Sequence, residues 1–249
     1  MGRGISLGEL ERYEDAITAY DKAIDIDPDD VFAWSGRGNS LFKLERYEDA
    51  IAAYDRAIEI DPDYTLAWNN RGNSLDDLER YEDAIAAYDK AIDIDPDYAN
   101  AWNNRGNSLD DLERYEDAIA SYDKAIDIDP DNGFAWNGRG NSLRKLERYE
   151  DAITAYDKAI DIDPDNGFAW NGRGNSLRKL ERYEDAIAAY DKAIDIDPDF
   201  AFAWNNRGVS LENLERNDAA LKSYEKAVEA DPDLITAVNN FNRLRNKLN

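Results

Sequence analysis

The chain repeats with a period of 34 residues from one end to the other. Proline recurs at this interval seven times and tryptophan six times, the latter from Trp34 to Trp204. The prolines are Pro28, Pro62, Pro96, Pro130, Pro164, Pro198 and Pro232. A fixed period of this length is typical of solenoids, whose repeats are each too small to bury their apolar face alone and must stack on their neighbours. We therefore expect the function to reside on the surface that stacking creates.

Each repeat is predicted to contain two amphipathic helices. In the repeat that spans residues 65–98, apolar side chains recur at helical spacing in two runs. The first run is Ala67, Trp68, Leu75 and Leu78, and the second is Tyr81, Ala84, Ile85, Tyr88, Ala91 and Ile92. Pro96 disfavours a helical conformation at Asp95 and is expected to end the second helix there.

The period divides the chain into seven repeats and a last helix. Full repeats begin at Val31, Thr65, Ala99, Gly133, Gly167 and Ala201, and each of these residues is position 1 of its repeat. The first repeat is truncated at its N-terminus, so residues 1–234 are predicted to form seven repeats. Residues 235–249 carry apolar side chains along one face and are predicted to form a solvating helix that caps the last repeat.

These repeats resemble the tetratricopeptide repeat family. Tryptophan at position 4, glycine at 8, alanine at 20, tyrosine at 24, alanine at 27 and proline at 32 match the family pattern, as in Trp68, Gly72, Ala84, Tyr88, Ala91 and Pro96. The resemblance covers essentially the whole chain. It implies an all-α fold, a right-handed α-solenoid superhelix of stacked antiparallel helix pairs. It also implies that the first helices line a concave groove, mainly through positions 2, 5, 6, 9, 12 and 13.

Position 7 departs from the family pattern, in which it is usually a large aliphatic residue. Here it is arginine in every repeat: Arg3, Arg37, Arg71, Arg105, Arg139, Arg173 and Arg207. We favour a structural interpretation, in which the stem is packed and the guanidinium pairs with carboxylates of the same or the next repeat, because buried charges are paired. The alternative is a row of cations that faces a ligand.

Amides are concentrated at positions 5, 6 and 9 of the first helices. They are Asn69, Asn70, Asn73, Asn103, Asn104, Asn107, Asn137, Asn141, Asn171, Asn175, Asn205 and Asn206. Asparagine is a mediocre helix former, so its donor and acceptor groups are the expected reason for its presence. We predict that these amides contact the backbone of an extended peptide. Two alternatives are a purely structural ladder between repeats and the duplication of a tolerated polar residue.

Positions 12 and 13 break the uniformity of the repeats in charge. Two successive repeats carry the acidic pairs Asp76-Asp77 and Asp110-Asp111, and the next two carry the basic pairs Arg144-Lys145 and Arg178-Lys179. Such blocks would orient a partner of opposite polarity or let two copies of the chain pair antiparallel. Block duplication is an equally good explanation of the second basic pair.

Aromatic side chains recur at position 2, as Phe32, Phe134, Phe168 and Phe202, and at position 34. They would lie near the same groove. We favour packing over apolar pockets for peptide side chains, although exposed aromatics are common interface anchors.

The composition excludes several functional classes. A net charge of −25, from 55 acidic and 30 basic residues, repels nucleic acid and anionic membrane surfaces. Cysteine and histidine are both absent, which removes thiolate zinc sites and Ser-His-Asp triads. No apolar run approaches the length of a membrane span, and the repeat pattern follows Met1 directly. We therefore expect a soluble, cytoplasmic protein without catalytic residues, metal or cofactor.

The predicted function is that of a non-catalytic scaffold or adaptor that binds an extended peptide segment of a protein partner in an Asn-rich concave groove. Self-assembly into a homo-oligomer, through the N-terminal end of the stack or the bipolar groove, is the leading alternative. A third possibility is that the chain is the targeting arm of a larger enzyme.

Overall fold

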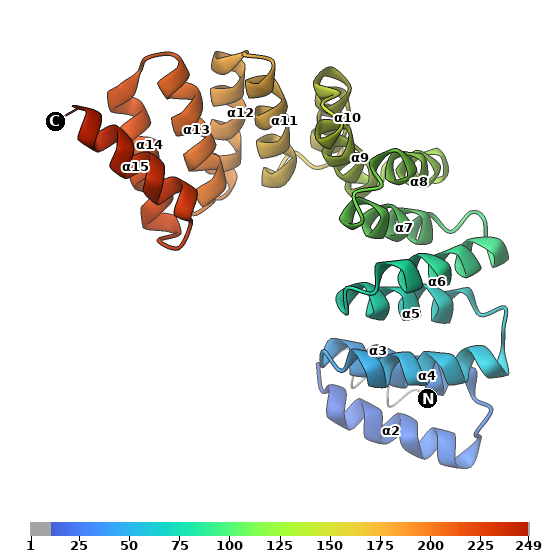
Figure 1. Cartoon of the computed structure of the whole chain (residues 1–249). Coiled ribbons are helices and arrows are strands. Elements are labelled where there is room, and N and C mark those ends of the chain that lie inside the picture. Colours follow the sequence, from blue (N-terminus) through green and yellow to red (C-terminus); the bar gives the residue numbers. More distant parts are fainter. Residues whose placement is uncertain (1–10, 249) are drawn as a thin grey trace. The chain divides into compact units, whose positions relative to one another are not determined.

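The computed structural model describes residues 11–248, and all regular secondary structure within them is helical. The chain forms two compact parts, Met1–Pro130 and Asp131–Asn249, called here the N-terminal stack and the C-terminal stack. The N-terminal stack contains α2 (Tyr13–Ile26), α3 (Val31–Lys43), α4 (Tyr47–Ile60), α5 (Thr65–Asp77), α6 (Tyr81–Ile94), α7 (Ala99–Asp111) and α8 (Tyr115–Ile128). The C-terminal stack contains α9 (Gly133–Lys145), α10 (Tyr149–Ile162), α11 (Gly167–Lys179), α12 (Tyr183–Ile196), α13 (Ala201–Asn213), α14 (Asn217–Ala230) and α15 (Ile235–Leu248) (Figure 1).

Within each stack, the helices pack in the order of the sequence. Each first helix contacts its own second helix, and each second helix contacts the first helix of the repeat that follows, as in the series α3, α4 and α5 (Figure 1). First helices of successive repeats also touch directly, as α3 with α5 and α5 with α7, or α9 with α11 and α11 with α13. The first helices of each stack therefore form a continuous row, which carries the amides of positions 5, 6 and 9 and the charged pairs of positions 12 and 13.

The core of each repeat is a small cluster that one tyrosine dominates. In the repeat at residues 65–98, Leu75, Ala84, Ala87 and Tyr88 are almost fully buried and form one cluster. The equivalent tyrosines of the other described repeats are 5% exposed or less. At the C-terminal end, Leu244 of α15 is buried against Leu211, Ala220 and Tyr224. Helix α15 thus covers apolar side chains of the last helix pair.

Tryptophan and proline together fix the turn between repeats. The indole Nε1 of Trp102 donates to the carbonyl oxygen of Pro96 at 3.0 Å. Trp34, Trp68, Trp170 and Trp204 make the same bond to the proline six residues earlier. The repeated spacing of the two residue types therefore reflects a hydrogen bond as well as apolar packing.

The turn within each repeat forces a glutamate into the left-handed region. Glu113 has a φ of 58°, and its counterparts in the other described repeats have values between 56° and 60°. The N–H of Glu113 donates to the carbonyl of Asp110, and the N–H of Arg114 donates to that of Leu109, at 2.9 and 2.8 Å. This is a Schellman motif, whose left-handed position favours glycine.

Replacing Glu113 by glycine is expected to raise the free energy of unfolding by about 1 kcal/mol, because it removes the strain of a side chain at positive φ. The change is measured by urea unfolding. The matched control is Glu116→Gly, three residues later in the first turn of α8, where glycine is expected to lower stability by up to about 1 kcal/mol. Equal effects of the two changes would contradict this account of the turn.

The arginines at position 7 pair with the second helix of the preceding repeat. The Nε of Arg105 donates to Asp89 at 2.7 Å, and its Nη1 donates to Ser121 of its own repeat at 2.6 Å. Its guanidinium also lies 5.9 Å from the centre of the Trp102 ring. Arg37, Arg71, Arg173 and Arg207 make the same pairing, with Asp21, Asp55, Asp157 and Asp191. The structural interpretation is confirmed for these residues, although the carboxylate belongs to the preceding repeat and not to the same or next one.

Replacing Arg105 by methionine is expected to lower the free energy of unfolding by about 1 to 2 kcal/mol, because the stem is kept while two charge-assisted hydrogen bonds are lost. The control is Arg114→Met. Arg114 also pairs with an aspartate, but its side chain is 52% exposed, against 23% for Arg105. An exposed pair of this kind contributes less than about 1 kcal/mol. Urea unfolding of both variants gives the comparison, and equal losses would show that the two pairs do not differ.

Candidate functional site

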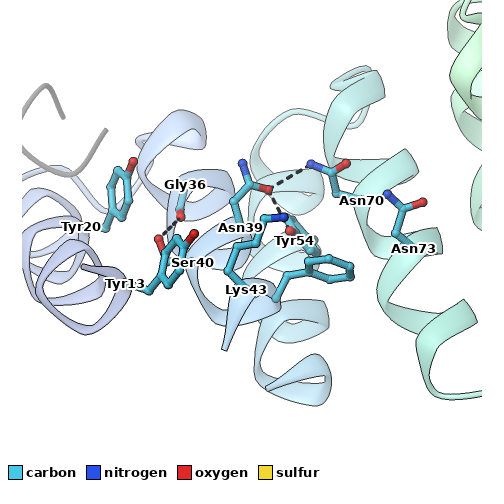
Figure 2. A pocket seen from close by; sticks show the side chains of 10 residues that line it. Tyr13, Tyr20, Gly36, Asn39, Ser40, Lys43, Tyr54, Asn70 and Asn73 are labelled. Carbon is cyan, nitrogen blue, oxygen red and sulfur yellow. Dashed lines mark hydrogen bonds between the residues drawn. The ribbon is translucent and has the colours of Figure 1, made fainter. Parts of the chain in front are cut away.

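The amides of the first helices bond to one another in a fixed pattern. In α7, the Nδ2 of Asn103 donates to Asn104 at 3.3 Å. The Nδ2 of Asn104 then donates to Asn73 of α5 at 3.0 Å and to Asn69 at 3.3 Å. One repeat earlier, Asn69 donates to Asn70, and Asn70 donates to Asn39 at 3.0 Å (Figure 2). Positions 5 and 6 are thus engaged largely inside the protein.

The core tyrosine fixes the amide at position 9. The hydroxyl of Tyr88 donates to the Oδ1 of Asn73 at 2.9 Å, so two donors converge on that oxygen. Figure 2 shows the same arrangement at Asn39, toward which Tyr54 and Asn70 both point. Asn107, Asn141 and Asn175 accept from Tyr122, Tyr156 and Tyr190 at 2.8, 2.7 and 2.9 Å. In each case the Nδ2 group has no hydrogen-bond partner in the described part of the chain.

In the C-terminal stack, the hydrogen bonds between amides of successive repeats depend on the residue at position 6. Asn206 donates to Asn171 at 3.3 Å, and Asn205 accepts from Asn240 at 3.0 Å. Position 6 of the α11 repeat is glycine, Gly172, and the ring of Tyr156 lies where its Cβ would be. The buried Oδ1 of Asn137 then has no hydrogen-bond partner among the described residues, and the same holds for that of Asn103. Within the C-terminal stack, the position-5 oxygen therefore accepts a bond from the next repeat where position 6 of that repeat is asparagine.

The acidic pairs of the N-terminal stack form a mutually repelling group. Asp76 is partly buried and accepts a hydrogen bond from Ser108 of the next repeat. Burial raises the pKa of Asp76, the bond from Ser108 opposes this rise, and the neighbouring charges of Asp111 and Asp77 add to it. The pKa of Asp77 is raised by burial and by Glu45, and that of Asp111 by burial and by Asp110.

The basic pairs of the C-terminal stack line one pocket of about 390 Å³. Its lining residues are Arg144, Lys145, Glu147, Tyr149, Asn175, Arg178, Lys179 and Asn206. They come from the three successive first helices α9, α11 and α13, and from the turn into α10. The structure thus brings both basic pairs together with two of the predicted amides.

The charges of this pocket reach the core tyrosines. The Nε of Arg144 lies 3.4 Å from the hydroxyl of Tyr156. Burial raises the pKa of Tyr190 to about 12, while Arg178 and Arg144 oppose the rise. In the N-terminal stack, by contrast, burial raises the pKa of Tyr88 and the aspartates Asp76 and Asp77 add to the rise. The two stacks therefore present fields of opposite sign at the same level of the repeat.

A second pocket, in the N-terminal stack, was not predicted from the sequence. It has a volume of about 560 Å³ and is lined by rings as well as amides (Figure 2). The rings are those of Tyr13, Tyr20, Phe42 and Tyr54, and the amides are Asn39, Asn70 and Asn73. The one signal in the sequence is Phe42, which stands at position 12, where the following repeats carry charged residues.

The last repeat carries an ion pair at position 12. Position 9 is Val209 here, and the hydroxyl of Tyr224 donates instead to Glu212 at 3.1 Å. The guanidinium of Arg243 in α15 donates to both carboxylate oxygens of Glu212 at 2.6 Å. The bonds from Arg243 lower the pKa of Glu212.

The aromatics at position 2 are more exposed than predicted. Phe134, Phe168 and Phe202 are 81%, 73% and 54% exposed, and Phe32 is 59% exposed. The rings of Phe32 and Tyr64, and those of Phe168 and Phe200, meet edge to face at 5.7 and 5.2 Å. The prediction that these side chains are packed is therefore wrong for most of their surface. The two ring contacts are made where position 34 of the same repeat is also aromatic.

Metal sites and membrane-spanning helices are not found among the described residues. No group of carboxylates among residues 11–248 could hold a metal ion. No helix in that range is long and apolar enough to cross a membrane.

Comparison with known proteins places these observations in a family. A tetratricopeptide repeat model matches residues 1–65, 69–133 and 171–235, and a second model of the same repeat matches residues 134–166. No curated protein sequence matches the chain. Among solved structures, YrrB, described as a TPR protein with an unusual peptide-binding site, is 28% identical over 76% of this chain and 97% of its own, with a TM-score of 0.63.

Two further solved structures resemble the chain. MamA is 27% identical over 65% of this chain and 94% of its own, with a TM-score of 0.61. A tetratricopeptide repeat protein from Parabacteroides merdae is 15% identical over 98% of this chain and 96% of its own, with a TM-score of 0.73, which shows the fold alone. Because the family models match nearly the whole length, the chain belongs to the tetratricopeptide repeat family.

Proposed function

We propose that this protein is a non-catalytic scaffold that holds an extended peptide along its row of first helices. The fold is one of protein–protein interaction scaffolds. The observation that carries the proposal is the state of the position-9 amides. Each has its oxygen bonded to a buried tyrosine, while its Nδ2 group has no partner among the described residues.

A row of such groups suits a peptide backbone. Each Nδ2 group supplies N–H donors, and an extended chain offers carbonyl acceptors at regular intervals. The tyrosine bond holds the amide before the ligand arrives, so less conformational entropy is lost on binding. In the N-terminal stack, the position-6 amides Asn70 and Asn104 support this arrangement, because they donate to the oxygens of Asn39 and Asn73.

The test exchanges the donor while keeping the acceptor. In an Asn39→Asp, Asn73→Asp double variant, one carboxylate oxygen still accepts from the core tyrosine, but the N–H groups are lost. Peptides are first selected with the whole chain from a bead-displayed library of uncharged random sequences. Their affinity for the double variant is expected to fall by about tenfold or more, since one or two hydrogen bonds are lost.

The control places the same charges elsewhere in the same two repeats. Ala52→Asp with Ala86→Asp adds two carboxylates on the exposed sides of α4 and α6. This variant is expected to bind the selected peptides as the parent does. The proposal would be overturned if the Asn39, Asn73 double variant bound the selected peptides with full affinity, while both this variant and the control kept the thermal stability of the parent.

A further inference from the structure

We propose that the pocket between α9, α11 and α13 binds a strongly anionic side chain of the peptide ligand, either a phosphorylated residue or a pair of adjacent carboxylates. This inference rests on the proposed function and adds the chemistry of the partner. Arg144, Lys145, Arg178 and Lys179 line the pocket, and the one acidic residue of its lining is Glu147. The pocket therefore concentrates positive charge in a chain whose net charge is −25.

The pocket cations differ from the other arginines of the same repeats in having no carboxylate partner. Arg148 and Arg182 pair with the aspartate three residues later, and Arg173 pairs with Asp157. None of the four pocket cations forms an ion pair with a residue in the described range. The Nε of Arg178 is buried beside Tyr190, whose rise in pKa Arg178 opposes, and it has no acceptor within hydrogen-bond distance among the described residues. No carboxylate of the described residues therefore balances the pocket cations, and a bound anion would supply that charge.

The neighbouring repeat shows how an anion fits at this level. There the carboxylate of Glu212 occupies position 12 and accepts two bonds from Arg243 and one from the core tyrosine, Tyr224. In the α9 repeat, position 12 is Arg144, which contacts the equivalent tyrosine, Tyr156. The C-terminal stack thus already holds one carboxylate beside a core tyrosine. The adjoining pocket has the cations but no carboxylate bound to them.

One amide adds a directional donor to these charges. Asn175 lines the pocket, its Oδ1 accepts from Tyr190 at 2.9 Å, and its Nδ2 group has no hydrogen-bond partner among the described residues. Two planar guanidiniums and an amide can surround the oxygens of a phosphoryl group or of two carboxylates, whereas a single carboxylate would leave donors unused.

The experiment uses three fluorescent peptides of one neutral sequence that carry serine, phosphoserine or a Glu-Glu pair at the same place. Binding to the whole chain is measured by anisotropy. The phosphoserine or the Glu-Glu peptide is expected to bind about tenfold or more tightly than the serine peptide, and the better of the two identifies the source of the anion. Equal affinity of all three peptides would overturn the inference.

The variant pair separates the pocket from the general field. Arg144→Gln with Arg178→Gln is expected to abolish the preference for the anionic peptide. Arg148→Gln with Arg182→Gln removes the same charge from the same two repeats, at side chains that are 53% and 55% exposed, and is expected to change affinity less than about twofold. If both double variants lost affinity for the anionic peptide equally, the pocket would have no specific role in binding it.

The outcomes also distinguish this inference from the proposed function. If the library peptides still depend on Asn39 and Asn73 but no anionic peptide is preferred, only the pocket assignment fails. If anionic peptides are preferred but the Asn39, Asn73 variant binds the library peptides fully, only the amide assignment fails. Light scattering tests one more outcome. If the parent chain dimerises and Arg144→Gln with Arg178→Gln abolishes the dimer, a second copy of the chain occupies the pocket. That result would overturn the inference of an external peptide ligand.

Discussion

Raising the pH above about 10 is expected to unfold the protein within a narrow range. Tyr54, Tyr88, Tyr122 and Tyr190 are each 2% exposed or less. Burial raises the pKa of Tyr190 to about 12, and it raises the pKa of the other three even further above the ordinary value of 10.0. In the unfolded chain the same hydroxyls would ionise near pH 10.

The sign of the effect follows from proton binding. Between the unfolded pKa and the raised folded pKa, the folded state keeps a proton that the unfolded state has lost. The free energy of unfolding therefore falls as the pH rises, by about 1.4 kcal/mol per pH unit for each tyrosine. With three such tyrosines in the N-terminal stack, the slope reaches about 4 kcal/mol per unit, against a total stability of about 5 to 15 kcal/mol for a typical domain. Below pH 10 this contribution to stability is fully present.

A single hydroxyl deletion tests the cause, because its effect is expected to change sign with pH. At neutral pH, Tyr122→Phe loses the bond to Asn107 and is expected to be about 1 kcal/mol less stable than the parent. At about pH 11 it is expected to be the more stable protein, because one ionising group has been removed from the unfolded state. Urea unfolding at both pH values measures the crossover.

Two results would contradict this account. One is a Tyr122→Phe variant that stays less stable than the parent at every pH. The other is a rise in tyrosinate absorbance that reaches all the buried rings before circular dichroism reports any loss of helix, since that would mean that the hydroxyls ionise inside the fold.

The period of the sequence predicted the fold because each repeated residue meets the same surroundings. Proline, tryptophan and the small residues of the 34-residue pattern mark helix ends and close contacts, and the observed helices begin and end where these residues place them. The left-handed glutamates were not predictable in this way. Glutamate at such a turn is unfavourable on its own, as at Glu113, and it is found there because the two packed helices determine the path of the chain.

The candidate site was predictable in its residues but not in its hydrogen bonding. The spacing of the asparagines placed the amides on one row of helices. It did not determine which amide atoms form hydrogen bonds within the protein. That depends on the reach from one repeat to the next, as in the bond from Asn104 to Asn73. It also depends on the hydroxyl of the core tyrosine, whose ring follows the apolar pattern of the second helix. The hydrogen-bonded ladder between repeats and the proposed ligand contacts therefore fall on different positions of the same helices.

Gly174→Ala is expected to destabilise the C-terminal stack strongly, although alanine is the better helix former. A Cβ at Gly174 would lie 2.6 Å from a carbon of the Tyr190 ring, which is fully buried beside Leu177 and Ala186. The ring cannot move away without displacing this cluster. Overpacking of this kind costs about 3 kcal/mol, whereas the gain in helix propensity is about 1 kcal/mol. A net loss of about 2 kcal/mol is expected in urea unfolding.

The same helix provides the control. At Gly167, the first residue of α11, a Cβ would lie 3.7 Å from the carbonyl oxygen of Ala193 and 3.8 Å from Ile196, which are ordinary contacts. Gly167→Ala is therefore expected to be as stable as the parent or slightly more so. A double-mutant cycle of Gly174→Ala with Tyr190→Leu then identifies the clash: if the ring is its source, the two losses are less than additive by about 1 kcal/mol or more. Additive losses would mean that the glycine is required for another reason.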